Sequence, residues 1–118
     1  MLTGDLVIVA LGDLQASNAG IVAALIPGAA TGNVFVTANG AIDARFGIDA
    51  ENFGSGSTGV TATGPVTATT GNGIFAKAAG GTVSVIAGDV SAASNTGIIV
   101  RQTNAAGAGP IFLSAGNV

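Results

Sequence analysis

The stretch TGVTATGPVTATTGNGIFA, residues 58–76, decides the fold of this chain. It holds three short runs, at residues 58–60, 64–68 and 73–76, in which apolar residues alternate with small or polar ones. Alternation with a period of two is the signature of a β-strand that buries one face. A glycine opens the second and third runs and indicates a turn, so the stretch predicts three short strands separated by corners.

The same three runs recur in the same order along the chain. The glycines that open the second run are separated by 28, 24, 24 and 28 residues, and they are Gly12, Gly40, Gly64, Gly88 and Gly116. The glycines that open the third run are separated by 27, 26 and 24 residues, and they are Gly20, Gly47, Gly73 and Gly97. A repeat of 20 to 50 residues is typical of a solenoid.

These strands are too short to be stable as isolated hairpins, so each must pair with its equivalent in the next coil. The sequence therefore predicts an all-β, single-domain parallel β-helix, or β-solenoid, over residues 1–118. Each coil of 24 to 28 residues has three short strands, and there are about four and a half coils. The glycines at the corners are expected to need a positive φ.

Stacking of equivalent strands predicts three interior ladders of apolar side chains. The first comprises Ile8, Val36, Val60, Val85 and Leu113; the second Leu14, Ile42, Val66, Val90 and Val118; the third Ile21, Ile48, Ile74 and Ile98. Small alanines fill the corners of the core, at Ala16, Ala44, Ala68 and Ala92. Insertions between the third run and the next first run predict loops at one corner, at residues 24–31, 51–57, 77–81 and 101–109.

Composition excludes several classes of function. The chain has no cysteine and no histidine, which removes disulfides, thiolate chemistry and the commonest zinc ligands. Three basic and six acidic residues give a net charge of −3, so we predict no binding to nucleic acid. The most apolar stretch, residues 20–30, is interrupted by Pro27 and Gly28 and is shorter than the ~20 residues of a membrane-spanning helix. The chain is therefore not expected to span a membrane.

The order of the runs, G-x-V-x-V, G-x-V-x-A and GI-x-A over about 25 residues, resembles the passenger regions of bacterial autotransporters and related large adhesins. The resemblance covers Leu6 to Val118. It implies a right-handed winding, export through an outer-membrane β-barrel, a place at the bacterial cell surface or outside the cell, and a stalk or adhesive role. The start in the middle of a repeat, without a positively charged leader, suggests a segment of a longer repeat protein.

Carboxylates are the first candidates for chemistry, because a carbohydrate-active enzyme needs two or three of them on one face. Asp43 and Asp49 share a coil, and Asp13, Asp43 and Asp89 lie near one column. Asp13 and Asp89 follow turn glycines, however, where a carboxylate accepts a hydrogen bond from a nearby backbone N–H. Other residues occupy the same column in the remaining coils: Ala41, Pro65 and Asn117. We therefore predict no catalytic, cofactor-binding or metal-binding residues.

The remaining candidates have structural interpretations. Arg45 is expected to pair with Asp43 or Glu51 at the surface, and the three cations, Arg45, Lys77 and Arg101, are too dispersed to form an acidic-ligand groove. Asn18, Asn72 and Asn95 precede the third run and are expected to form a partial ladder. Phe35, Phe75 and Phe112 take outward positions, either in an exposed contact patch or beneath a loop.

The sequence thus predicts a structural or adhesive β-helix stalk segment without catalysis. Two alternatives stay open: a fragment of a carbohydrate-active β-helix enzyme, and a truncated or designed self-assembling β-solenoid. The end coils expose apolar core residues and unpaired strand edges, so self-association through the ends is expected. Other expected partners are a host surface or a carbohydrate.

Overall fold

The computed structural model describes residues 5–25, 32–103 and 111–117, and these ranges form strands and no helix. In the first two coils the strands are β1 (Leu6–Ala10), β2 (Leu14–Gln15), β3 (Ala19–Leu25), β4 (Val34–Ala38), β5 (Ile42–Ala44) and β6 (Phe46–Asn52). The others are β7 (Thr58–Ala62), β8 (Val66–Ala68), β9 (Ile74–Ala78), β10 (Val83–Ala87), β11 (Val90–Ala92), β12 (Ile98–Gln102) and β13 (Ile111–Ala115).

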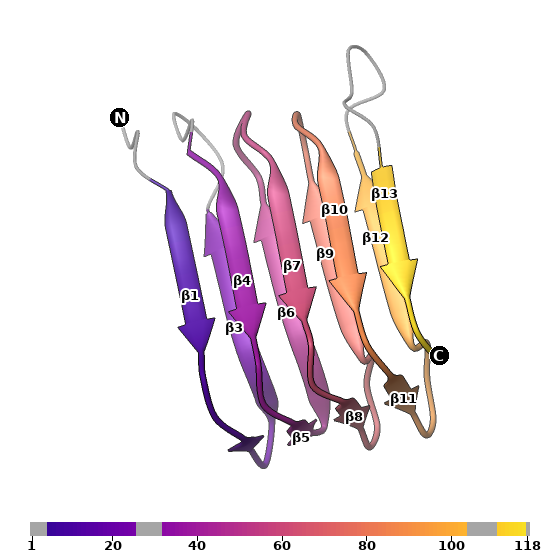
Figure 1. Ribbon diagram of the computed structural model, residues 1–118. Coiled ribbons are helices and arrows are strands. Elements are labelled where there is room, and N and C mark those ends of the chain that lie inside the picture. Colours follow the sequence, from indigo (N-terminus) through magenta and orange to yellow (C-terminus); the bar gives the residue numbers. More distant parts are fainter. Residues whose placement is uncertain (1–4, 26–31, 104–110, 118) are drawn as a thin grey trace.

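The strands stack into three parallel sheets, one for each run of the repeat (Figure 1). Sheet A has the order β1-β4-β7-β10-β13, sheet B β2-β5-β8-β11, and sheet C β3-β6-β9-β12. Each coil therefore contributes one strand to each sheet, and β13 starts a fifth coil. The all-β solenoid with three strands per coil is confirmed.

The coils wind in a right-handed sense, as the resemblance implied. In Figure 1 the strands of sheet A run downward at the front, those of sheet C run upward behind them, and successive coils advance from left to right. The stack measures 35 × 23 × 21 Å along its principal axes. Hydrogen bonds between coils run along the long axis, because each strand pairs with the strand one coil away.

The three predicted ladders are confirmed in register. Ile8 pairs with Val36, Val36 with Val60, Val60 with Val85 and Val85 with Leu113. The ladder from Leu14 to Val90 and the ladder from Ile21 to Ile98 are equally continuous. Val118 lies outside the described residues. Each shift by one coil places a similar side chain above its predecessor, so the repeat length sets the register.

The core is narrow and almost wholly aliphatic, and its centre lies in the middle coils. Ile48, Ile74 and Val60 are at most 1% exposed, and Ala44 and Ala68 fill the predicted corners. Ala16 and Ala92 are less buried because they lie in the outer coils. Small residues at the corners let the three sheets approach closely.

Two buried polar side chains interrupt this aliphatic core and both are hydrogen-bonded. The Thr58 hydroxyl donates to the Lys77 carbonyl at 2.7 Å. Asn52 Nδ2 donates to the carbonyls of Gly32 and Ser57, and its Oδ1 accepts from the Gly54 N–H at 2.9 Å. Asn52 therefore stabilises the corner between sheets C and A through three hydrogen bonds.

Most of the corner glycines serve close packing rather than a positive φ, which corrects the sequence prediction, and Gly12 is the exception because a Cβ there meets no atom within 4 Å. None of the corner glycines for which backbone geometry is described has φ between +20° and +160°. Instead, a Cβ on Gly47 would overlap the Gly73 carbonyl oxygen and Cγ1 of Val66. Glycine is needed because the chain turns against both the next coil and the core side chains of sheet B.

All four predicted loops were placed too early, and the first of them began at Ala24, although Ala24 and Leu25 belong to β3. The segment from Glu51 was expected to be a loop, but Glu51 and Asn52 continue β6, and Lys77 and Ala78 likewise belong to β9. Arg101 and Gln102 extend β12 in the same way. The strand prediction ended early because polar and charged residues follow the apolar pairs, although they keep the alternation. Residues 26–31 and 104–110 of the predicted loops lie outside the described residues.

Candidate functional site

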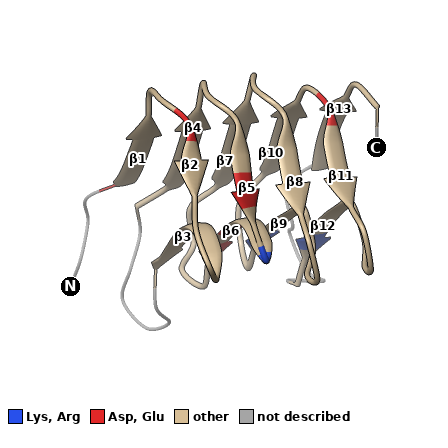
Figure 2. Ribbon diagram, turned by 90° about the horizontal axis from the view of Figure 1, so that it is seen from below, with Lys and Arg blue, Asp and Glu red and all other residues tan. Residues whose placement is uncertain are grey.

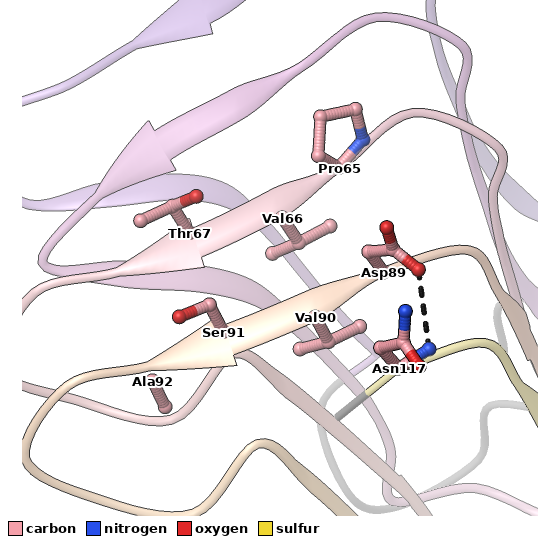
Figure 3. Close-up of a pocket in the computed structure, with 8 residues that line it drawn as sticks. All are labelled: Pro65, Val66, Thr67, Asp89, Val90, Ser91, Ala92 and Asn117. Atoms are coloured by element: carbon pink, nitrogen blue, oxygen red, sulfur yellow. Dashed lines mark hydrogen bonds between the residues drawn. The ribbon is translucent and has the colours of Figure 1, made fainter.

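The outer face of sheet B carries shallow hollows between neighbouring short strands. One, of about 360 Å³, lies over β8 and β11 (Figure 3). Thr67 and Ser91 lie side by side across it, as register partners, and Asp89 and Asn117 lie at its end. Its polar groups are two hydroxyls, one amide and one carboxylate.

The carboxylate in this hollow already has a structural partner. Asp89 Oδ1 accepts from the Asn117 backbone N–H at 3.1 Å (Figure 3). In the same way, Asp13 Oδ1 accepts from the N–H of Ala41, which lies in the next coil, at 2.8 Å. The predicted turn-capping role of Asp13 and Asp89 is therefore confirmed, with the capped N–H belonging to the following coil.

The four candidate aspartates, Asp13, Asp43, Asp49 and Asp89, do not form one cluster. Asp13 and Asp43 line a common hollow on sheet B, whereas Asp89 lies two coils further along. Asp43 is on β5 and Asp49 is on β6, so they face outward from different sheets. Figure 2 shows one acidic position on β5 and few, widely spaced charges over the coils. The fold therefore does not bring Asp43 and Asp49 together.

The cations contact aromatic rings and a hydroxyl. Arg45 Nε donates to Thr70 Oγ1 at 3.1 Å, and the guanidinium carbon lies 5.8 Å from the centre of the Phe46 ring. The predicted pairing of Arg45 with Asp43 or Glu51 is wrong: among the described residues neither carboxylate bonds to it. Lys77 Nζ lies 4.5 Å from the centre of the Phe53 ring.

The outer face of sheet C holds a different kind of hollow, of about 160 Å³, here called the Asp49 hollow. Its lining residues are Phe46, Ile48, Asp49, Glu51, Asn72 and Phe75. Asp49 and Glu51 are alternate residues of β6, so both point outward on one face. Phe75 is the register partner of Asp49 on β9, and it closes one side of the hollow.

Asp49 is electrostatically unusual for a residue on an outer face. Burial raises its pKa to about 6, the neighbouring Glu51 adds to this increase, and Lys77 lowers it. Asp49 Oδ1 is buried without a hydrogen-bond donor, and so is Asn72 Oδ1 in the same hollow. Two acceptors from neighbouring coils, one on β6 and one in the turn before β9, are thus enclosed without a partner, which is uncommon for buried polar atoms.

Sequence reasoning did not find this group. Glu51 was assigned to a loop, and Phe46 and Asn72 stand outside the repeated runs. The signal that could have found it is the alternation Asp49-x-Glu51, combined with the 26-residue spacing of Gly47 and Gly73, which sets Phe75 beside Asp49.

The predicted asparagine ladder is wrong. The Asn95 Oδ1 accepts from the neighbouring Thr96 N–H at 2.9 Å, and Asn72 Oδ1 has no donor. The Asn18 backbone carbonyl, rather than its side chain, receives the N–H groups of Arg45 and Phe46. Asn72 is offset by one position from the column of Asn18 and Asn95, because it precedes its ladder isoleucine, Ile74, by two residues rather than three.

The outward phenylalanines are exposed to different extents. Phe35 is 40% exposed and Phe112 is 58% exposed on sheet A, whereas Phe75 is half-buried in the Asp49 hollow. Val7 and Ile86 are also exposed on the outer face of sheet A. Val7 and Phe35 are register partners and lie side by side, whereas Gly59 and Ser84 lie between Phe35 and Phe112 in the same register row.

The described residues contain neither a metal-binding cluster nor a membrane-spanning helix. No group of three or more acidic, histidine or cysteine side chains is placed to hold a metal ion in these ranges. The same ranges contain no helix of the length and hydrophobicity that crossing a bilayer requires. Comparison of the chain with family models, curated proteins and solved structures finds no match.

Proposed function

We propose that this chain is a structural stalk segment of a secreted or surface-exposed bacterial protein, with an adhesive rather than a catalytic role. The observation that carries the proposal is the unbroken parallel register of all three sheets. A stack of this kind gains length and stiffness by adding equivalent coils, since each coil contacts its neighbours alone. The bacterial surface location rests on the resemblance of the repeat to autotransporter passengers and large adhesins.

Self-association through the end coils is part of this proposal. Ile111 and Leu113 of β13 occupy inward ladder positions and are 48% and 54% exposed. A further coil of the same pattern would cover both side chains and pair with the free edge of β13. Burial of apolar surface at roughly 25 cal/mol per Å² would then favour end-to-end contact.

Sedimentation velocity over a range of protein concentrations tests this contact. We expect the sedimentation coefficient to rise with concentration, and Leu113→Lys to remove the rise. Phe112→Lys is the matched control, because Phe112 points outward and is exposed to a similar extent. A wild-type monomer at every concentration, or an equal effect of the two variants, would contradict the proposed end-to-end association.

The adhesive ligand is proposed to be a host surface or a carbohydrate. The hydroxyls and carboxylates on the outer face of sheet B, including Thr67, Ser91 and Asp43, are the groups that could bind sugar hydroxyls. Binding to immobilised glycans, compared between wild type and Thr67→Val, measures this directly.

A further inference from the structure

We propose that the Asp49 hollow binds the guanidinium group of an arginine side chain of a peptide or protein partner. The site is formed by neighbouring strands of two middle coils and requires nothing from the end coils. A variant can therefore lose arginine binding while it keeps end-to-end association, or the reverse, so the two proposals can fail separately.

The first argument is the supply of hydrogen-bond acceptors. Asp49 Oδ1 and Asn72 Oδ1 are both buried without a donor, and Glu51 adds a second carboxylate on the same side of β6. An ionised carboxylate can accept hydrogen bonds and cannot donate them. A group that completes this site must therefore be rich in donors, and the Asp49 and Asn72 side chains must rotate outward to meet it, because both Oδ1 atoms are enclosed.

The second argument is that, among the described residues, no cation of the chain forms an ion pair with either carboxylate, although Lys77 lies beside Glu51 in register and its charge lowers the pKa of Asp49. Lys77, which faces Glu51 across the sheet, directs its Nζ to the Phe53 ring, and Arg45 binds Thr70. Across the described ranges, neither Asp49 nor Glu51 has an ion-pair partner. The two carboxylates repel one another, and an incoming cation would relieve that repulsion.

The third argument is shape. Phe46 and Phe75 contribute apolar ring surface to the hollow. The Arg45 guanidinium carbon lies 5.8 Å from the centre of the Phe46 ring, so the half-buried Phe75 is the lining ring without a cation contact. A guanidinium group is planar, stacks on aromatic rings and presents a fork of N–H donors that suits carboxylates. The hollow of about 160 Å³ is well below the ~300–1,000 Å³ of sites for larger ligands, so a single side-chain head group matches it better than a whole small molecule.

A sugar fits this hollow less well. Sugar hydroxyls both donate and accept, whereas the Asp49 hollow offers carboxylates and one amide, so the Asn72 NH₂ is its side-chain donor. The hollow is therefore distinct in chemistry from the hydroxyl-lined hollow on sheet B.

The experiment titrates the ¹⁵N-labelled protein with N-acetyl-arginine amide at pH 7.5 and follows backbone amide shifts by NMR. We expect saturable shifts at residues 46–51 and 72–75 with a Kd of about 1 mM, as is reasonable for one isolated head group. N-acetyl-citrulline amide, which is neutral and nearly isosteric, should bind at least about ten times more weakly, since it lacks the charge.

Variants locate the site and give the contradicting outcomes. Asp49→Asn should raise the Kd about tenfold or more, whereas Asp43→Asn, with the same charge change on sheet B, should leave it within about twofold. Lys77→Gln should lower the Kd, because it removes a competing cation. Circular dichroism establishes that each variant is folded. Equal binding of the arginine and citrulline amides, equal effects of Asp49→Asn and Asp43→Asn, or saturation by CaCl₂ without any response to the arginine amide would overturn the proposal.

Discussion

The pKa of the Asp49 carboxyl depends on its surroundings in the Asp49 hollow, to which two coils contribute. Its pKa of about 6 in the folded chain exceeds its ordinary value of 3.8, chiefly because of burial, with Glu51 adding to the increase and Lys77 opposing it. The folded state therefore binds this proton more tightly than the unfolded state does. Its contribution to stability is fully present below about pH 3.8 and is lost as the pH rises through about 6.

This linkage gives a prediction for Asp49→Asn. Between pH 4 and pH 7.5, wild type should lose about 1 kcal/mol of unfolding free energy relative to the variant, a figure reduced from the full shift because Asp49 is partly exposed. Urea unfolding at both pH values measures the difference. Asp43→Asn, which lies on the other face, is the control. If the unfolding free energy of wild type and of Asp49→Asn changed by the same amount between the two pH values, burial of Asp49 would not destabilise its charged form.

At the scale of elements, the spacing of the coils depends on the column formed by Gly20, Gly47 and Gly73. A Cβ on any of these residues would overlap a glycine carbonyl of the next coil and a core side chain of sheet B. The backbone cannot retreat, because the strands on both sides are fixed by the ladders. The column therefore sets how closely sheets B and C approach each other.

We expect Gly47→Ala to destabilise the fold by about 2–4 kcal/mol, in the range of overpacked or strained core positions. Gly12→Ala is the matched control, because a Cβ at Gly12 meets no atom within 4 Å. It should change stability by less than about 0.5 kcal/mol. Thermal unfolding of both variants gives the comparison, and similar melting temperatures for the two would refute the role of close packing.

Some of these elements could be predicted from the sequence and others could not. The ladders from Ile8, Leu14 and Ile21 were predictable because apolar residues recur at the coil spacing. The fold requires little at those positions beyond an apolar side chain. The Asp49 hollow was not, since it depends on side chains from outside the repeat, Phe46 and Asn72, meeting across strands. The corner glycines were assigned the wrong cause, because sequence cannot distinguish a close approach from a positive φ.

At the scale of the whole molecule, stability is graded along the axis. β1 and β13 each have one neighbour in sheet A, whereas β4, β7 and β10 each have two. Core side chains follow the same trend, from fully buried Ile74 to half-exposed Leu113. In a stack whose coils contact their neighbours alone, the ends open before the middle.

Hydrogen exchange tests this gradient. The amides of Ile48 and Ile74, which donate to Gly73 and Gly97 at 2.9 and 2.8 Å, should be the slowest to exchange. Amides of β1 should exchange faster by about tenfold or more, since fraying of the end coil has a smaller free energy than opening of the middle. Uniform protection from β1 to β12 would instead mean that the stack opens as a single cooperative unit.

The direction of the inter-coil hydrogen bonds has a mechanical consequence. These bonds lie along the axis while the chain runs across it, so tension applied between the two ends loads them in line. Coils would then peel away from an end one after another, and each released coil of 24 to 28 residues would lengthen the tether by about 80 to 100 Å. A stalk with this geometry would yield in steps under load and act as a stepwise force absorber.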